Sequence, residues 1–143
     1  AKRTGEAFVP SSGVDPRVLG YAMKTSDGHE LFIENGSPRM AAVTTMAHEL
    51  THIWQFSNWD LDAIAHRYGK ANLLAVSEGM ATWAMVQYLL FVRDFDFARR
   101  QEAYAMARDD EYGIGFRIFS ERYPLRVDGD IDEDTPFQGP FPL

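Results

Sequence analysis

The stretch AHELTHIWQ, residues 47–55, decides both the fold and the chemistry that this sequence predicts. His48 and His52 are four residues apart, so on a helix their side chains project from one face and can reach a single ion. Glu49 follows His48 directly, which leaves its carboxylate beside that ion and free to hold a water molecule. The HExxH pattern therefore predicts a helix that carries two metal-ligating imidazoles and a general base.

A third ligand is needed, because a catalytic zinc ion normally takes three protein ligands and leaves its fourth position to water. The chain has no cysteine, so any ligand must be His, Asp or Glu. The continuation that metzincins use is also absent, since Gln55 and Asn58 stand where a glycine and a further ligand would be.

Glu78, in the stretch SEGMATW, is the first candidate for that ligand. It lies 26 residues after His52, and a carboxylate in the first turn of a following antiparallel helix can return to the motif helix. Gly79 beside it permits the two backbones to approach closely. Asp60 and Asp62 are the alternatives, because a turn after the motif helix could also return an oxygen to the metal.

The motif lies in the second half of a helix that the apolar spacing predicts from Pro38 onward, with Ser37 as its cap. HELFIE, residues 29–34, alternates and is rich in strand formers, so it predicts a strand whose edge could bind an extended peptide. Ser77 is the expected cap of a second long helix that runs to about Val92.

Three further helices are expected. A short one covers residues 61–68 and ends at Gly69. A longer one is capped by Asp94 or Asp96 and runs to about residue 108. After an interruption at DDEYG, the last covers residues 114–122.

The domain organisation follows from the length of 143 residues, which suits a single core. Residues 1–28 are rich in turn formers and predict an irregular lead-in with at most short strands. The expected domain covers residues 1–127, and residues 128–143 form an acidic tail or truncated linker rich in Pro and Gly. The expected fold class is α+β and mostly helical.

Composition excludes several classes of protein. The net charge of −7 and pI near 5.0 argue against a nucleic-acid binder, which would normally carry a basic face. The longest apolar run, residues 79–92, is too short to span a bilayer, so no membrane partner is expected. The first thirty residues hold no apolar segment of the kind a signal peptide needs, and the expected location is cytoplasmic.

Three blocks of the sequence resemble, in order and spacing, the peptidase domain of the DA1 family. They are NGSPRMAAVTTMAHELTHIWQ, SEGMATW and DDEYGIGFRIFSERYPL, and the similarity covers roughly residues 30–125. The family has a Gly-x-Pro-Arg entry to the motif helix, an AHE-x-x-HAW-like core, an EG pair and a YG-x-GFR block. Plant members also carry zinc-binding LIM modules, which this cysteine-free chain lacks, so their regulation by ubiquitin is not transferred.

The resemblance implies a zincin-like fold of the gluzincin type, with a small sheet beside the motif helix and a second helix that bears a ligand. It implies Zn²⁺ as cofactor, with His48, His52 and Glu78 as ligands. It also implies a zinc metalloendopeptidase that hydrolyses polypeptides by metal-activated water, with Glu49 as general base. The resemblance leaves room for further domains or a regulatory partner outside this chain.

Other residues are candidates for supporting roles. Tyr112, in the YG block, could donate its hydroxyl to the oxyanion or simply pack in a turn, and His66 is a weaker oxyanion candidate. Arg117 could anchor a substrate carboxylate, although pairing with acidic residues 109–111 is the simpler interpretation. Many gluzincins place an Asp four residues after the ligand Glu, whereas Thr82 stands there, so another group must orient an imidazole.

Two alternative functions stay open at the level of sequence. The first is a catalytically inactive zinc-binding module of the same fold that interacts with proteins. The second is a hydrolase of non-peptide amides. The sequence identifies neither the substrate nor the residues that bind it.

Overall fold

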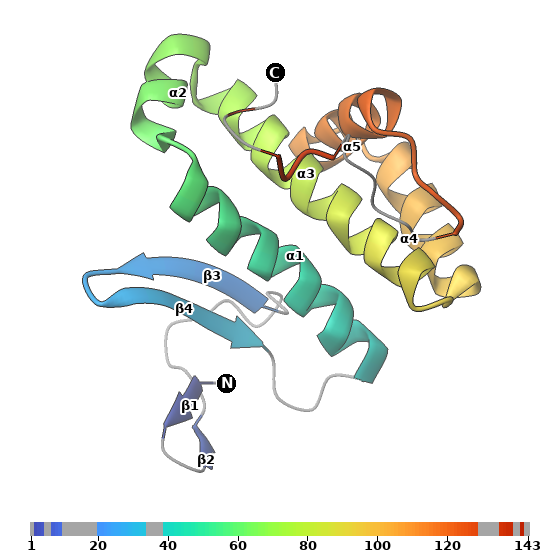
Figure 1. Ribbon diagram of the computed structural model, residues 1–143, viewed down its shortest axis with the longest axis horizontal. Helices are drawn as coiled ribbons and strands as arrows, with labels where there is room; N and C mark the ends of the chain where they lie inside the picture. Colours follow the sequence, from blue (N-terminus) through green and yellow to red (C-terminus); the bar gives the residue numbers. More distant parts are fainter. Residues whose placement is uncertain are drawn as a thin grey trace.

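The computed structural model describes residues 2–4, 7–9, 20–33, 39–128, 135–138 and 141. Helices dominate these residues, and two small antiparallel hairpins precede them, which confirms the α+β, mostly helical class (Figure 1). The strands are β1 (Lys2–Thr4), β2 (Ala7–Val9), β3 (Gly20–Thr25) and β4 (Gly28–Ile33). The helices are α1 (Arg39–Asn58), α2 (Leu61–Tyr68), α3 (Lys70–Phe91), α4 (Phe95–Ala107) and α5 (Glu111–Arg122).

Helix α1 lies between the β3–β4 hairpin on one side and the α3–α5 group on the other (Figure 1). It carries the HExxH motif in its second half, as the apolar spacing predicted. The expected cap Ser37 and the following Pro38 lie outside the described residues. This central position encloses the motif face of α1 from both sides.

The β3–β4 hairpin confirms the strand predicted from HELFIE, which is β4. Its partner β3 lies in the region expected to be an irregular lead-in, and the register pairs Ala22 with Leu31. Of the two strands, β3 supplies the residue that faces the motif, since Ala22 borders the cavity above the histidines. The strand edge next to the site therefore belongs to β3 rather than to the predicted HELFIE strand.

Helices α2 and α3 are separated by a single residue, Gly69, whose φ of 89° is a conformation that favours glycine. The predicted end of the short helix at Gly69 is confirmed. The predicted start of the next helix is wrong, because α3 begins at Lys70 and Ser77 lies within it. Glu78 therefore projects from the middle of a long helix, not from a first turn.

Helix α3 crosses α5 at two glycines. A Cβ built on Gly79 would lie 2.2 Å from the carbonyl carbon of Gly115, and one built on Gly115 would lie 1.8 Å from the Ala75 carbonyl oxygen. Gly79 was expected to allow close approach to the motif helix, but it allows close approach to α5. The crossing brings the first turn of α5 beside Glu78.

Aspartates cap three of the described helices. Asp94 accepts a hydrogen bond from the Phe97 backbone N–H, which confirms one of the two predicted caps for α4. Asp110 caps α5 by accepting from the Gly113 N–H, so this helix begins three residues before the predicted start at residue 114. The DDEYG sequence starts the helix instead of interrupting it.

The core lies where α3 meets α1, α2 and α5. Met80, Val86, Phe116 and Phe119 have no exposed surface, and Trp83 donates from Nε1 to the Tyr123 carbonyl at 2.7 Å. These side chains belong to one hydrophobic cluster, and α3 contributes Met80, Trp83 and Val86 to it, so α3 is the central element of the core.

One apolar face of α1 stays open. Met46 and Leu50 are 42% and 49% exposed, and Tyr88 and Phe91 are 37% and 63% exposed. They line a groove of about 780 Å³ between α1 and α3. The motif helix is thus enclosed on its histidine face and open on this one.

The described part of the expected tail contributes to the core. Phe137 packs edge-on against Trp54 with ring centroids 5.1 Å apart, and Phe141 packs against Trp59 at 5.2 Å and Tyr68 at 5.5 Å. Residues 129–134, 139–140 and 142–143 lie outside the described part of the chain.

Among the described helices, α3 alone has the length and apolar composition that crossing a membrane would require. Half of its most apolar window is buried within the fold, as expected for a core helix. It is also longer than the apolar run recognised in the sequence, because it starts at Lys70.

Candidate metal centre

Three side chains from two helices converge on one point. The Nε2 atom of His48 lies 3.0 Å from Glu78 Oε2, and the Nε2 atom of His52 lies 3.2 Å from the same oxygen. The two Nε2 atoms are 3.2 Å apart. The structure therefore brings together the two motif histidines and the carboxylate that the sequence favoured as third ligand, close enough to hold a metal ion.

The separations within this trio fit a tetrahedral metal site. Zinc binds imidazole nitrogen and carboxylate oxygen at roughly 2.0–2.1 Å, so two ligands of a regular tetrahedron lie roughly 3.3–3.4 Å apart. The three observed separations of 3.0 to 3.2 Å are slightly shorter than that edge. A small outward movement of each side chain would accommodate the ion, and the donor set of two imidazoles and one carboxylate suits Zn²⁺.

The two alternative ligands lie elsewhere. Asp60 is exposed and caps α2, accepting from the Ala63 backbone N–H at 3.1 Å. Asp62 is exposed in the first turn of α2. Neither lines the cavity above the histidines, so among the described residues Glu78 completes the cluster.

Electrostatics of the trio favour an ionised Glu78. Burial raises the pKa of Glu78, but the hydrogen-bonding contacts with His48 and His52 outweigh burial and lower it to about 2. Burial likewise lowers the pKa of His52, and the hydrogen bond and charge of Glu78 outweigh that effect and raise it. A negative oxygen thus faces two imidazoles in a partly enclosed site, which is an attractive position for a cation.

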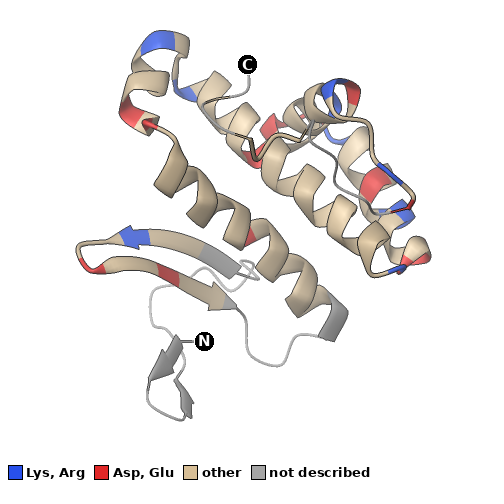
Figure 2. Cartoon of the chain, in the orientation of Figure 1, with Lys and Arg blue, Asp and Glu red and all other residues tan. Residues whose placement is uncertain are grey.

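Glu49 is an isolated acid in an otherwise uncharged helix. Beyond Arg39 at its start, α1 contains no other Asp, Glu, Lys or Arg (Figure 2). Glu49 is only 8% exposed, and burial raises its pKa, while the neighbouring histidines and a hydrogen bond from the Ala22 backbone lower it. A carboxylate with a raised pKa beside a candidate metal site suits a general base, because a higher pKa makes it a stronger proton acceptor.

Tyr112 reaches the site from the first turn of α5. Its ring stacks on His48 with centroids 6.1 Å apart and an interplanar angle of 18°, and the Arg108 guanidinium carbon lies over the ring, 4.4 Å from its centroid. Burial and then the charge of Glu78 raise the pKa of Tyr112 to about 12, so its hydroxyl remains a donor. The structure thus places Tyr112 beside the candidate metal cluster, and its role as an oxyanion donor stays a prediction.

Gln55 is the site residue that sequence reasoning missed. It has no exposed surface, its Oε1 lies 2.9 Å from His52 Nδ1, and its Nε2 donates to the Ser77 carbonyl at 3.0 Å. It contacts an imidazole as the expected orienting group would, in place of the Asp that many gluzincins have at the position of Thr82. The available signal was a glutamine one turn after His52 on an apolar helix.

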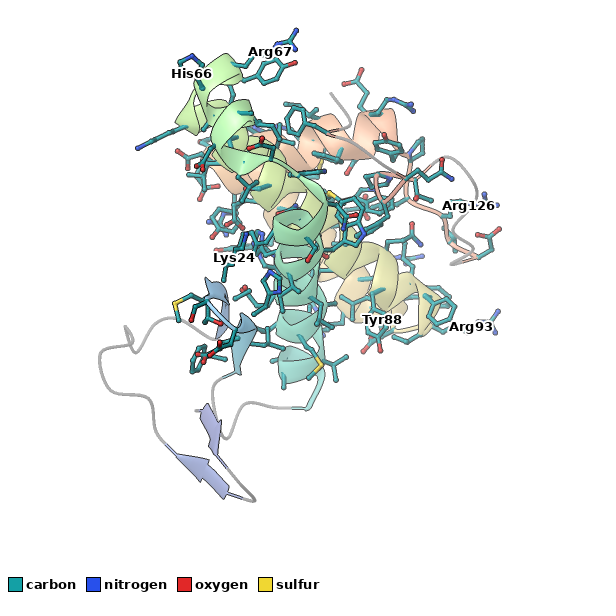
Figure 3. All side chains as sticks on the ribbon, turned by 60° about the vertical axis from the view of Figure 1, so that its left-hand side comes forward. Lys24, His66, Arg67, Tyr88, Arg93 and Arg126 are labelled. Atoms are coloured by element: carbon teal, nitrogen blue, oxygen red, sulfur yellow. The ribbon has the colours of Figure 1, made fainter. Side chains whose placement is uncertain are left out.

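Two further candidates serve elsewhere. His66 is exposed on α2 and points away from the other helices (Figure 3). It does not line the cavity, so the oxyanion role is not supported. Arg117 donates to the carbonyls of Met106 and Arg108, both at 2.9 Å, and so closes the end of α4 instead of pairing with residues 109–111.

A cavity of about 360 Å³ opens over the trio. Its wall combines Ala22 of β3, the motif side chains and Tyr112 with a second group of Phe56, Leu61 and Leu73. The cavity is large enough for part of a peptide, and its polar lining includes the side chains of His48, Glu49, His52, Gln55, Glu78 and Tyr112.

Comparison of the chain with models of known protein families, with curated proteins and with solved structures gives no match.

Proposed function

We propose that this protein is a zinc-dependent metallopeptidase with a zincin-like domain of the gluzincin type, similar to the DA1 peptidases. The observation that carries the proposal is the convergence of His48, His52 and Glu78 within 3.2 Å, with Glu49 buried next to them. An uncharged helix gains nothing from burying an extra carboxylate, because burial penalises the charged form. A catalytic role for Glu49 would explain why the carboxylate is buried there, since buried ionisable groups with shifted pKa values cluster at functional sites.

The proposed reaction divides its work among four groups. His48, His52 and Glu78 would hold the zinc ion, which supplies a Lewis acid and lowers the pKa of water from about 15.7 to about 7. Glu49 accepts a proton from the water molecule as the water oxygen attacks the scissile carbonyl carbon. Glu49 then returns that proton to the amine nitrogen as the C–N bond breaks.

The remaining parts of the cavity position the substrate. The Tyr112 hydroxyl donates to the oxyanion that forms on the carbonyl oxygen. Because Ala22 borders the cavity, an extended polypeptide would add as a strand along β3, with its backbone paired to that edge. This arrangement favours unfolded or flexible polypeptide segments as substrates.

The test compares wild type with Glu49→Gln on unfolded protein substrates, with and without a chelator. We expect cleavage by wild type, its loss with chelator and its recovery on adding Zn²⁺. Glu49→Gln should retain zinc and lose activity, because the amide cannot take up the proton. Asp62→Asn serves as a matched control, since that carboxylate is exposed and outside the cavity. Equal activity in wild type and Glu49→Gln would overturn the proposal.

A second candidate function is a zinc-binding module that interacts with proteins and has no turnover. The open groove between α1 and α3, with Met46, Leu50 and Phe91 exposed, is the observation that favours it. Zinc bound without cleavage of any polypeptide would support this alternative. Cleavage of small amides but not of proteins would instead support a non-peptide hydrolase.

A further inference from the structure

Gln55 is the polar side chain next to the trio that the proposed reaction does not use. It is fully buried, and it makes two hydrogen bonds: one to the His52 imidazole on its own helix α1 and one to the Ser77 backbone on α3. A buried amide retains its place only when its hydrogen bonds are made, because an unsatisfied one costs about 1–3 kcal/mol. The contacts with His52 and Ser77 therefore account for the burial of this amide.

The direction of both hydrogen bonds follows from one fixed acceptor. The Ser77 carbonyl cannot donate, so the group of Gln55 that faces it at 3.0 Å must be the NH₂ group. The amide oxygen then faces His52 Nδ1 at 2.9 Å, and that nitrogen must carry a proton to make the bond. In the neutral imidazole the lone pair is consequently on Nε2, the atom that points at Glu78 and His48.

We propose that Gln55 is a positioning residue that fixes His52 in the tautomer able to bind metal through Nε2 and ties the motif helix to the ligand-bearing helix. Ser77 directly precedes Glu78, so the same amide sets the orientation of one ligand and the distance to the next. This inference rests on the proposed metal site and adds the group that holds two of its three ligands in register. Groups of this kind typically change metal affinity by about 10–100-fold when removed.

The chain offers a matched control in Gln87. It is also buried, at 2% exposure, and it also makes two hydrogen bonds, in this case both to the backbone: it donates to the Arg126 carbonyl and accepts from the Arg126 N–H. It does not line the cavity of the metal site. Gln87→Met therefore removes a buried amide of the same kind without touching the ligands.

The experiment measures zinc affinity by competition with a chromophoric chelator for wild type, Gln55→Met and Gln87→Met. Gln55→Met should bind zinc about 10–100-fold more weakly, while Gln87→Met should bind it as wild type does. Equal affinity in all three proteins, or an equal loss in both variants, would overturn the inference. A wild type that binds no zinc would overturn the proposed function and this inference together.

A second measurement needs no variant. In NMR spectra of the zinc-loaded wild type, the His52 Nδ1 proton should be observed and should exchange slowly with water, because Gln55 accepts it in a fully buried position. If that proton exchanges as fast as one on an exposed imidazole, Gln55 does not hold it and the inference is wrong. This readout is independent of turnover and of how well Gln55→Met folds.

Discussion

Gly79 on α3 and Gly115 on α5 lie in direct backbone contact, and this contact sets the position of Tyr112 relative to Glu78. A Cβ on Gly79 would come within 2.2 Å of Gly115, so neither helix can move closer or carry a side chain there. Glu78 directly precedes one glycine, and Tyr112 lies one turn before the other. The helix crossing is therefore part of the construction of the site.

Substitution of Gly79 by alanine should destabilise the protein by about 1–3 kcal/mol, because the added methyl group overpacks the crossing. At an ordinary position inside a helix the same change is expected to stabilise by roughly 0.8–1 kcal/mol, so the sign separates the two cases. Urea denaturation of wild type and variant measures it. An unchanged or increased unfolding free energy would contradict the packing described.

Glu49→Gln should raise the thermal stability of the metal-free protein at neutral pH. Burial raises the pKa of Glu49 in the folded state, so folding favours the protonated form, and this contribution is lost as pH rises through the folded-state pKa. The amide of Gln at position 49 stays neutral at every pH, so the variant does not lose this stability as pH rises. The difference in Tm between the two proteins should shrink as pH falls below 4.5, the ordinary pKa.

Tyr112→Phe should retain zinc and lower kcat by about 10²–10³-fold, as expected when one oxyanion donor is removed. Since the pKa of Tyr112 is raised to about 12, its hydroxyl should stay protonated across the working range. Ultraviolet titration of wild type against Tyr112→Phe measures that pKa. A normal kcat in Tyr112→Phe would show that the hydroxyl does not stabilise the oxyanion and that Tyr112 serves in packing alone.

Zinc affinity should fall on the acid side through the histidines and not through Glu78. The pKa of Glu78 is lowered to about 2, so it stays charged, whereas the pKa of His52 is raised above its usual 6.5 and a proton there competes with zinc. Affinity should decrease by roughly tenfold per pH unit for each imidazole that gains a proton. Competition with a chelator over this range provides the measurement. A constant affinity from pH 7 to 5 would be inconsistent with histidine ligands.

Phe141→Ala should lower stability by about 1–2 kcal/mol, below the usual 3–5 kcal/mol for a fully buried Phe, because its ring is only partly buried. It packs against Trp59 and Tyr68, and so contributes to the core from beyond the predicted domain boundary. Phe91→Ala is the matched control, since Phe91 is 63% exposed and should change stability little. Equal effects of the two changes would mean that Phe141 packs no better than a surface ring.

The sequence was sufficient for the parts of the site whose geometry depends on local spacing. The four-residue interval between His48 and His52 determines that both project from one face of α1, and this holds in the structure. The short helix ending at Gly69 was predictable for a similar reason, because a residue with φ of 89° favours glycine.

The sequence was insufficient to predict helix boundaries and side-chain roles that tertiary contacts determine. Ser77 had a cap-forming side chain, yet α3 starts at Lys70, because residues 70–76 already suit a helix and Gly69 ends the preceding one. DDEYG, which ends at Gly113, suggested a break before a helix over residues 114–122, but α5 begins at Glu111 and contains Gly113. A Cβ on Gly113 would meet the Arg108 backbone, and one on Gly115 would meet α3 at Ala75, so both positions leave no room for a side chain. Gln55 gained its role only when α3 brought the Ser77 carbonyl within reach.

Whether His48, His52 and Glu78 hold one ion is tested by a zinc titration of wild type, Glu78→Ala and Asp62→Ala, with metal content measured after removal of loosely bound ions. His48, His52 and Glu78 holding one ion predicts one equivalent of tightly bound zinc in wild type and in Asp62→Ala, and loss of that equivalent in Glu78→Ala. Retention of zinc by Glu78→Ala together with its loss from Asp62→Ala, or a wild type that binds none, would contradict the account.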